Sequence, residues 1–244
     1  MAASLEPLPD DWDRCLAVVA HPDDIEYGIS MAVAHWTGEG KQVGYVLATS
    51  GEAGIDGVPP DEAGPLREVE QRNAAALVGV DHVEFLGLAD GVIEYGLALR
   101  RLLAGVIRRH RPDIIVTINH GLTFGGGSGD AMLNMADHRN LGLAVLDAAR
   151  DAGNRWVFTD LVDQGLEPWN GVRWVAVSAT GTPTHAVDVT GHLDTGVASL
   201  QAHRAYLDGL GEAVDTRAML EGFAHAGGKG LGTELAISFE LIGV

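Results

Sequence analysis

The sequence predicts a single-domain α/β protein with a mostly parallel sheet and helices on both faces. Through the first half of the chain, short apolar runs alternate with segments of helical periodicity. Strands that alternate with crossover helices form parallel sheets, and strands that are apolar throughout are buried on both faces. Because no linker rich in Gly, Pro or Ser divides the chain, we expect one domain over residues 1–244, with a regular core at 15–150 and an irregular part at 151–244.

The expected elements of the core follow one another along the chain. Apolar, strand-like runs lie at residues 15–20, 43–48, 83–86 and 114–118. Helical segments follow these runs at residues 24–36, 65–80, 97–109 and 141–149. In the first helix, Ile25, Ile29, Val33 and Trp36 recur at the spacing of one helical face. Pro65 is expected in the first turn of the second helix, where its missing N–H costs nothing.

Beyond residue 150 the pattern is less regular. Strands are expected at residues 174–177 and 234–242, and a helix at 192–207. In open parallel sheets, ligands bind beyond the carboxyl ends of the strands. The loops that follow residues 20, 48, 86 and 118 are therefore the expected location of a functional site.

Composition excludes several classes of function. The chain has 16 basic and 34 acidic residues and a net charge of −18, so its surface is expected to repel nucleic acids and anionic membranes. Its one cysteine, Cys15, rules out an internal disulfide. No run approaches the roughly 18–20 apolar residues of a membrane span. Residues 1–14 are acidic and lack the features of a secretion signal, so we expect a cytoplasmic protein.

The most informative segment follows the first strand. His21, Asp23, Asp24 and Glu26 lie within six residues, at the point where a strand ends and a helix begins. An imidazole and a carboxylate a few residues apart are good Zn²⁺ ligands, and a second carboxylate can act on the bound water. The alternative is that Asp23 or Asp24 only caps the helix. Glu26 fits either a helix surface or a position behind the metal ligands.

A catalytic zinc ion normally has three protein ligands and one open position, so a further ligand is expected on another loop of the same edge. His138 is the natural candidate, because it follows the strand at 114–118 and a long loop, at the start of a new helix. That loop, residues 120–134, contains five glycines and is expected to form a flap that shapes access for the substrate, the alternative being an unspecialised loop. It lacks the spacing of a phosphate-binding loop.

These residues resemble the LmbE/PIG-L family of zinc-dependent N-acetylglucosaminyl deacetylases. The resemblance starts with AHPDD at residues 20–24 and the later Asp137-His138 pair. It continues in TSGEAG at 49–54, LREVE at 66–70, FLGLADG at 85–91 and RPD at 111–113, and more loosely in AHR at 202–204. It covers about residues 15–150 and implies a Rossmann-like fold without a dinucleotide.

The resemblance also implies roles for particular residues. The metal ligands correspond to His21, Asp24 and His138, and the general base corresponds to Asp23. The contacts to the sugar correspond to Arg67 and Asp90, for which the alternative is a pair of solvated surface charges. The implied cofactor is Zn²⁺, although the same ligands suit another divalent metal.

One position departs from the family pattern. Many members have a histidine three residues before the metal-binding histidine, where it assists as an acid or electrophile, and this chain has Met135 there. Another group must then protonate the leaving amine. The sequence leaves three candidates open: Asp23 after it has accepted the proton of water, His120, and His203.

The expected reaction is hydrolysis of a sugar N-acetyl group, with acetate and an amino sugar as products. The expected partner is a small amino-sugar molecule, and assembly into a homo-oligomer stays open. Two alternatives remain: a zinc amidase that acts on a thiol conjugate or a secondary-metabolite glycoside, and a sugar- or nucleotide-binding module without activity. The second alternative predicts no bound metal.

Overall fold

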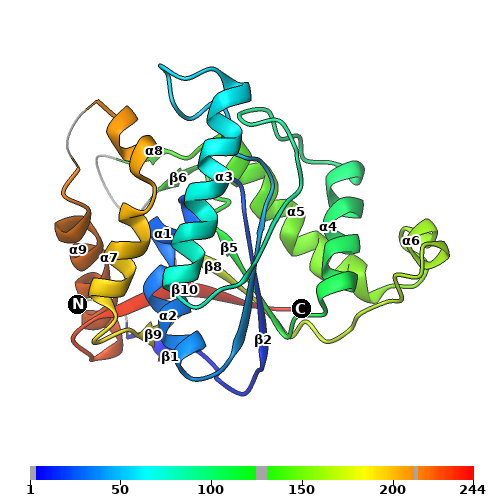
Figure 1. Ribbon diagram of the computed structural model, residues 1–244. Helices are drawn as coiled ribbons and strands as arrows, with labels where there is room; N and C mark the ends of the chain where they lie inside the picture. Colours follow the sequence, from blue (N-terminus) through cyan, green and yellow to red (C-terminus); the bar gives the residue numbers. More distant parts are fainter. Residues whose placement is uncertain (1–3, 125–130, 212–213) are drawn as a thin grey trace.

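The computed structural model describes residues 4–124, 131–211 and 214–244. Part of the predicted flap, residues 125–130, therefore lies outside the described residues. The described chain forms three layers, a central sheet with helices on each face (Figure 1). The predicted fold class is confirmed.

The sheet has eight strands in the order β1-β9-β10-β8-β5-β2-β3-β4. Their bounds along the chain are β1 Glu6–Pro7, β2 Arg14–Val19, β3 Gln42–Leu47, β4 His82–Phe85, β5 Ile114–Ile118, β8 Trp174–Ser178, β9 His185–Asp188 and β10 Ala236–Gly243. Neighbouring strands pair in parallel, except that β10 runs antiparallel to both β8 and β9. A short hairpin of β6 (Thr123–Phe124) and β7 (Met132–Leu133) lies outside this sheet.

Strand order places a topological switch point beside β2. The chain passes from β2 to β3 and β4 on one side, and later adds β5 and β8 on the other side. Crevices for ligands form where the strand order reverses in this way. The carboxyl ends of β2 and β5 therefore define where a functional site is expected.

An apolar core lies between the sheet and the helices on each of its two faces. Within β2, Ala17 and Val19 belong to one core, whereas Leu16 and Val18 belong to the other, because successive strand side chains point to opposite faces. The first core is covered by α1 (Asp24–Gly28), α2 (Ser30–Gly38), α3 (Pro60–Leu77), α7 (Leu193–Gln201) and α9 (Thr216–Leu231). The second is covered by α4 (Leu97–His110), α5 (Ala136–Gly153) and α6 (Thr159–Asp163). The short helix α8 (Arg204–Gly209) packs against α3.

Several helix boundaries differ from the sequence-based expectation. The helix expected at 24–36 is two helices, because Ile29, with φ −140°, interrupts it. The second helix begins at Pro60, so Pro65 lies in its interior and gives up one backbone hydrogen bond there. The helix expected at 192–207 is α7 followed by α8. Helix α5 begins five residues before the expected position 141, which places His138 in its first turn.

Helix α9 and strand β9 were not expected from the sequence at all. Helix α9 contains several glycines, which disfavour a helix when propensity alone is considered. The fold requires two of them, because a Cβ at Gly227 would overlap the Ala236 carbonyl oxygen and one at Gly228 would approach the Glu234 carbonyl oxygen to 2.6 Å. These glycines allow the helix to pack directly on the backbone beside β10.

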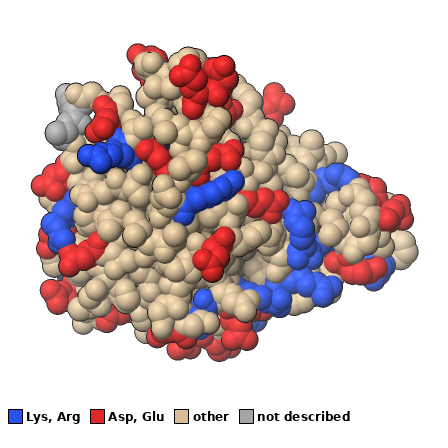
Figure 2. Space-filling model, in the orientation of Figure 1, with Lys and Arg blue, Asp and Glu red and all other residues tan. Residues whose placement is uncertain are grey.

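Charged side chains are spread over the surface. In Figure 2, acidic groups occur over most of the visible face, with basic side chains between them.

Among the described residues, no helix combines the length and the apolar composition that crossing a membrane would require.

Candidate metal centre and active site

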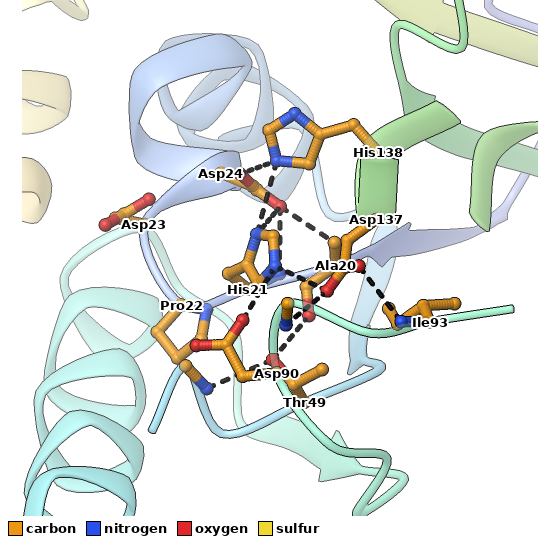
Figure 3. A network of polar contacts seen from close by, with 12 residues as sticks. Ala20, His21, Pro22, Asp23, Asp24, Thr49, Asp90, Ile93, Asp137 and His138 are labelled. Carbon is orange, nitrogen blue, oxygen red and sulfur yellow. Dashed lines mark hydrogen bonds and ion pairs between the residues drawn. The ribbon is translucent and has the colours of Figure 1, made fainter. Parts of the chain in front are cut away.

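The three predicted metal ligands converge at the switch point (Figure 3). His21 follows β2, Asp24 is the first residue of α1, and His138 is the third residue of α5; all three are buried. His138 Nε2 lies 3.0 Å from Asp24 Oδ1 and 3.2 Å from His21 Nδ1. One ligand atom from each residue lies within 4.8 Å of the others, a spacing that one metal ion can bridge.

The outer nitrogens of both histidines are held by acceptors. His138 Nδ1 donates to Asn134 Oδ1 at 3.0 Å. His21 Nε2 donates to Asp137 Oδ2 at 3.2 Å and lies 3.1 Å from Asp90 Oδ1. Metal-binding histidines commonly donate their other N–H in this way, which fixes the ring and its tautomer. Consequently the lone pair of each inner nitrogen is directed to the shared point.

Asp24 is oriented by its own loop. Its Oδ2 accepts hydrogen bonds from the backbone N–H of Ala20 at 3.1 Å and of His21 at 2.9 Å. Its Oδ1 is left to face His138. Two imidazole nitrogens and a carboxylate oxygen that meet without water between them require a cation, either a proton or a metal ion, and this donor set suits a divalent metal.

Electrostatics also favour positive charge at this centre. Burial opposes the charged form of His21, but hydrogen bonds with Asp137, Asp24 and Asp90 outweigh it and raise its pKa to about 12. Burial likewise opposes ionisation of Asp24, but the adjacent His138 and His21 hold its pKa well below the usual range. Buried carboxylates surround this point, and a divalent cation would satisfy them.

Asp23 lies beside the centre but is held by different partners. It precedes α1 with φ 84°, a left-handed conformation that costs energy for a residue other than glycine. Its backbone N–H donates to Gln71 Oε1 at 3.0 Å, and its Oδ2 accepts from Arg67 Nη2 at 2.8 Å. Burial raises the pKa of Asp23 to about 7, against the opposing charge of Arg67 and with the repulsion of Asp24.

Arg67 is a buried clamp on α3 and not a solvated surface charge. In addition to Asp23, it donates from Nη1 to the Gly51 carbonyl at 2.7 Å and from Nη2 to the Pro22 carbonyl at 2.8 Å. A Cβ at Gly51 or Gly54 would overlap the guanidinium as it is placed here, so the two glycines leave the space that Arg67 occupies. Arg67 therefore ties the loops after β2 and β3 together.

Asp90 lies on the loop after β4 and is likewise held in place. Its Oδ2 accepts the backbone N–H of Ala53 at 2.9 Å, and its own N–H donates to Glu52 Oε1 at 2.8 Å. Asp137 fixes the same loop, because its carboxylate accepts the N–H of Gly91 at 2.8 Å and of Ile93 at 3.0 Å. The solvated alternative for Asp90 is wrong, since its side chain is 7% exposed.

The centre opens into a large cavity of about 1110 Å³. The metal-site residues, Asp23, Arg67 and Asp90 line one part of it. Apolar side chains from the β6–β7 hairpin and from α9 line another part, namely Phe124, Met132, Met219 and Phe223. Met135, which occupies the position where the family pattern has a histidine, also lines the cavity. The volume exceeds what a single sugar ring requires.

The two histidines considered as acids do not line this cavity among the described residues. His203 is fully buried, with its Nε2 3.2 Å from Glu26 Oε2. From that position His203 does not reach the cavity, so the structure contradicts the expectation that it could give a proton directly to a substrate. His120 is half-buried on the loop after β5, and the described residues offer its Nδ1 no hydrogen-bond partner.

Three supporting residues were given no role from the sequence: Asn134, Gln71 and Asp137, the last of which was noted only as part of the motif. Gln71 lies one helical turn after Arg67, so both reach Asp23 from the same face of α3. Gln71 Nε2 also donates to Glu26 Oε1 at 2.9 Å, which places Glu26 behind the ligands and not on the helix surface. The sequence signal that could have found Gln71 is its i, i+4 spacing from Arg67. For Asn134 and Asp137, the sequence offers only their closeness to His138 along the chain.

Fold and site together define a doubly wound α/β protein with a buried His-Asp-His group that can hold a metal ion. The family model described as PIG-L: GlcNAc-PI de-N-acetylase matches residues 16–149, more than half of the chain. The chain therefore belongs to this family, as the sequence motifs predicted.

Individual relatives agree with the family assignment. A diacetylchitobiose deacetylase of Thermococcus kodakarensis is 28% identical over 206 residues, which cover 82% of this chain and 72% of that protein. A 1D-myo-inositol 2-acetamido-2-deoxy-alpha-D-glucopyranoside deacetylase of Thermomonospora curvata is 28% identical over 245 residues, covering 81% and 82%. The solved structure of N,N'-diacetylchitobiose deacetylase from Pyrococcus horikoshii, with an inhibitor, superposes with a TM-score of 0.85 at 22% identity and covers 95% of this chain and 84% of that one.

Proposed function

We propose that this protein is a metal-dependent hydrolase that removes the N-acetyl group from a small molecule containing N-acetylglucosamine. The observation that carries the proposal is the convergence of His21, Asp24 and His138, whose ligand atoms lie within 4.8 Å of one another beside the buried Asp23. Family membership supports it, as do relatives named for deacetylation of such substrates.

The proposed metal is Zn²⁺, held by His21 Nδ1, Asp24 Oδ1 and His138 Nε2. Two imidazoles and one carboxylate are a common protein ligand set for catalytic zinc, which leaves a coordination position open. When bound, zinc supplies Lewis acidity that polarises an amide carbonyl and lowers the pKa of water to about 7.

Asp23 is the proposed general base. Burial raises the pKa of Asp23 above the usual range for a carboxyl group, and a raised pKa makes a carboxylate a better proton acceptor. Arg67 and Gln71 keep its carboxylate and backbone in one conformation, so little ordering is left for the reaction itself.

Asp23 is also the proposed acid for the leaving amine. An amide nitrogen must be protonated before it can leave, and Met135 has no proton to give. Because neither His120 nor His203 lines the described cavity, Asp23 is favoured to return the proton that it took from water.

Arg67 and Asp90 are the proposed substrate contacts. Both line the cavity next to the metal site. Asp90 can accept a hydrogen bond from a sugar hydroxyl, while its other contacts to Ala53 and His21 keep it in place. In addition to contacting the substrate, Arg67 would hold Asp23 and the rim of the cavity.

The test is a panel of N-acetyl sugars and other N-acyl conjugates assayed for release of the free acid. We expect acetate release from at least one N-acetylglucosamine derivative, loss of that activity after chelation, and recovery with Zn²⁺. Release only from thiol conjugates or secondary-metabolite glycosides would favour the amidase alternative. Sugar binding that is unaffected by chelation, with no turnover of any member, would favour the binding module.

A further inference from the structure

A second group of metal-binding side chains lies far from the switch point, at the free edge of the sheet. It consists of His82 and Glu84 of the edge strand β4 and of His110, the last residue of α4. We propose that these three residues bind a second divalent transition-metal ion. The proposal does not depend on the proposed function, because the two groups share no residue.

Local structure brings the three side chains together. His82 and Glu84 are two positions apart on a strand and so point to the same face of the sheet. Helix α4 ends over that face, where His110 Nε2 lies 2.8 Å from Glu84 Oε2. The rings of His82 and His110 are 4.9 Å apart between centroids, and one ligand atom from each of the three residues lies within 4.8 Å of the others.

A neighbouring arginine orients the carboxylate of Glu84. Arg109 donates to Glu84 Oε1, so that the other oxygen, Oε2, faces His110. Ligating carboxylates are commonly fixed by an outer hydrogen bond of this kind. The positive charge of Arg109 opposes a metal ion, but the carbonyl end of α4 and the net charge of −18 favour one.

The donor set indicates which metals would bind. Two imidazoles and one carboxylate favour Zn²⁺, Ni²⁺ or Cu²⁺ over Mg²⁺ and Ca²⁺, which prefer oxygen ligands. His82 is exposed and can turn towards the ion at little cost. Because the group lies on the surface, water would complete the coordination.

The experiment counts bound zinc in the untagged full-length protein. The protein is stripped with a chelator, incubated with Zn²⁺, separated from free metal and measured by elemental analysis. We expect about two equivalents in the wild type and about one in His82→Ala, with N-acetyl hydrolysis unchanged in that variant. His225→Ala is the matched control, since His225 is also an exposed histidine, 3.7 Å from one carboxylate, Glu221. This variant should keep both equivalents.

A second pair of variants separates the two centres. His138→Ala should retain about one equivalent, and His82→Ala/His138→Ala should retain none. Equal zinc content in His82→Ala and the wild type, or in the double variant and His138→Ala, would overturn the proposal. If only the proposal of the central metal site were wrong, the result would be different. His138→Ala would then contain as much zinc as the wild type, while His82→Ala would still contain less.

Discussion

Adjacent carboxylates in this protein have opposite electrostatic environments. Asp24 is surrounded by His138 and His21, which lower its pKa, whereas burial raises that of Asp23 to about 7. Titratable groups whose environments drive their pKa values apart are typically those that divide acid–base work. Asp24 is therefore suited to remain a charged ligand, and Asp23 is suited to accept and return a proton.

Replacement of Asp23 tests this division. We predict that Asp23→Ala retains zinc but loses activity by ~10²-fold or more, the usual effect of removing a general base. The rate of acetate release and the zinc content are both measured. Full activity in the variant would remove Asp23 from the mechanism, and loss of zinc would show that it is a ligand.

Replacement of His138 and of its partner Asn134 tests the ligands. His138→Ala should lose zinc from the central site. Asn134→Leu keeps the ligand but removes the acceptor that fixes its ring, so zinc affinity should fall by roughly 10–100-fold. Competition with a chelator of known affinity gives the value, and an unchanged affinity in Asn134→Leu would show that the ring is fixed by packing alone.

The metal ligands could be predicted from the sequence, whereas the residues that support them could not. His21, Asp23 and Asp24 were found because they lie together at the end of a predicted strand, and His138 followed from the need for a third ligand and from the motif. Asn134, Asp137 and Gln71 act by orienting other residues. That role depends on distances between segments far apart in the chain, which residue types do not reveal.

At the scale of elements, α3 is the platform for the proposed base. Arg67 and Gln71 project from one face of it to Asp23, and Gln71 continues to Glu26, whose carboxylate lies beside His203. This buried chain of contacts joins α3, α1 and the junction between α7 and α8. It holds the left-handed backbone of Asp23 in place.

Gln71→Leu should disturb this platform without touching the metal. The variant leaves the N–H of Asp23 without a buried partner, which costs about 1–3 kcal/mol of stability. We also predict a lower kcat with zinc content unchanged, because Asp23 would no longer be fixed. Arg72→Gln, at an exposed neighbouring position, is the control. A Gln71→Leu enzyme with wild-type kcat would show that Arg67 alone positions the base.

Helix α9 offers a matched pair of glycines. A Cβ at Gly227 would overlap the carbonyl oxygen of Ala236, whereas one at Gly222 would meet nothing within 4 Å. Gly227→Ala should therefore lower the stability by ~1–3 kcal/mol, as overpacking does, and Gly222→Ala should raise it by roughly 0.5–1 kcal/mol through helix propensity. Urea denaturation measures both, and equal effects would contradict the packing seen here.

Elements were predictable where the local pattern agreed with the tertiary structure. The apolar strands β2, β3 and β5 were found nearly at their bounds. Helix α9 was missed because its glycines serve close packing on the backbone beside β10, and this tertiary requirement overrides helix propensity. The break at Ile29 is equally invisible in a helical pattern that continues through it.

For the whole molecule, the switch point explains why the site forms where it does. Residues 117 positions apart in the chain, His21 and His138, meet because β2 and β5 are neighbours and end at the same edge. The rule for open sheets predicted this edge from the sequence alone. The size of the cavity could not be predicted, because it depends on how α9 and the β6–β7 hairpin close over the edge.

The most direct measurement is X-ray diffraction from zinc-loaded crystals, recorded on both sides of the zinc absorption edge. We predict an anomalous peak at roughly 2.0–2.2 Å from His21 Nδ1, Asp24 Oδ1 and His138 Nε2, with Asp23 nearby but outside bonding distance. A map with no peak among these three atoms, or with the ion bound by Asp23 instead of Asp24, would contradict this prediction.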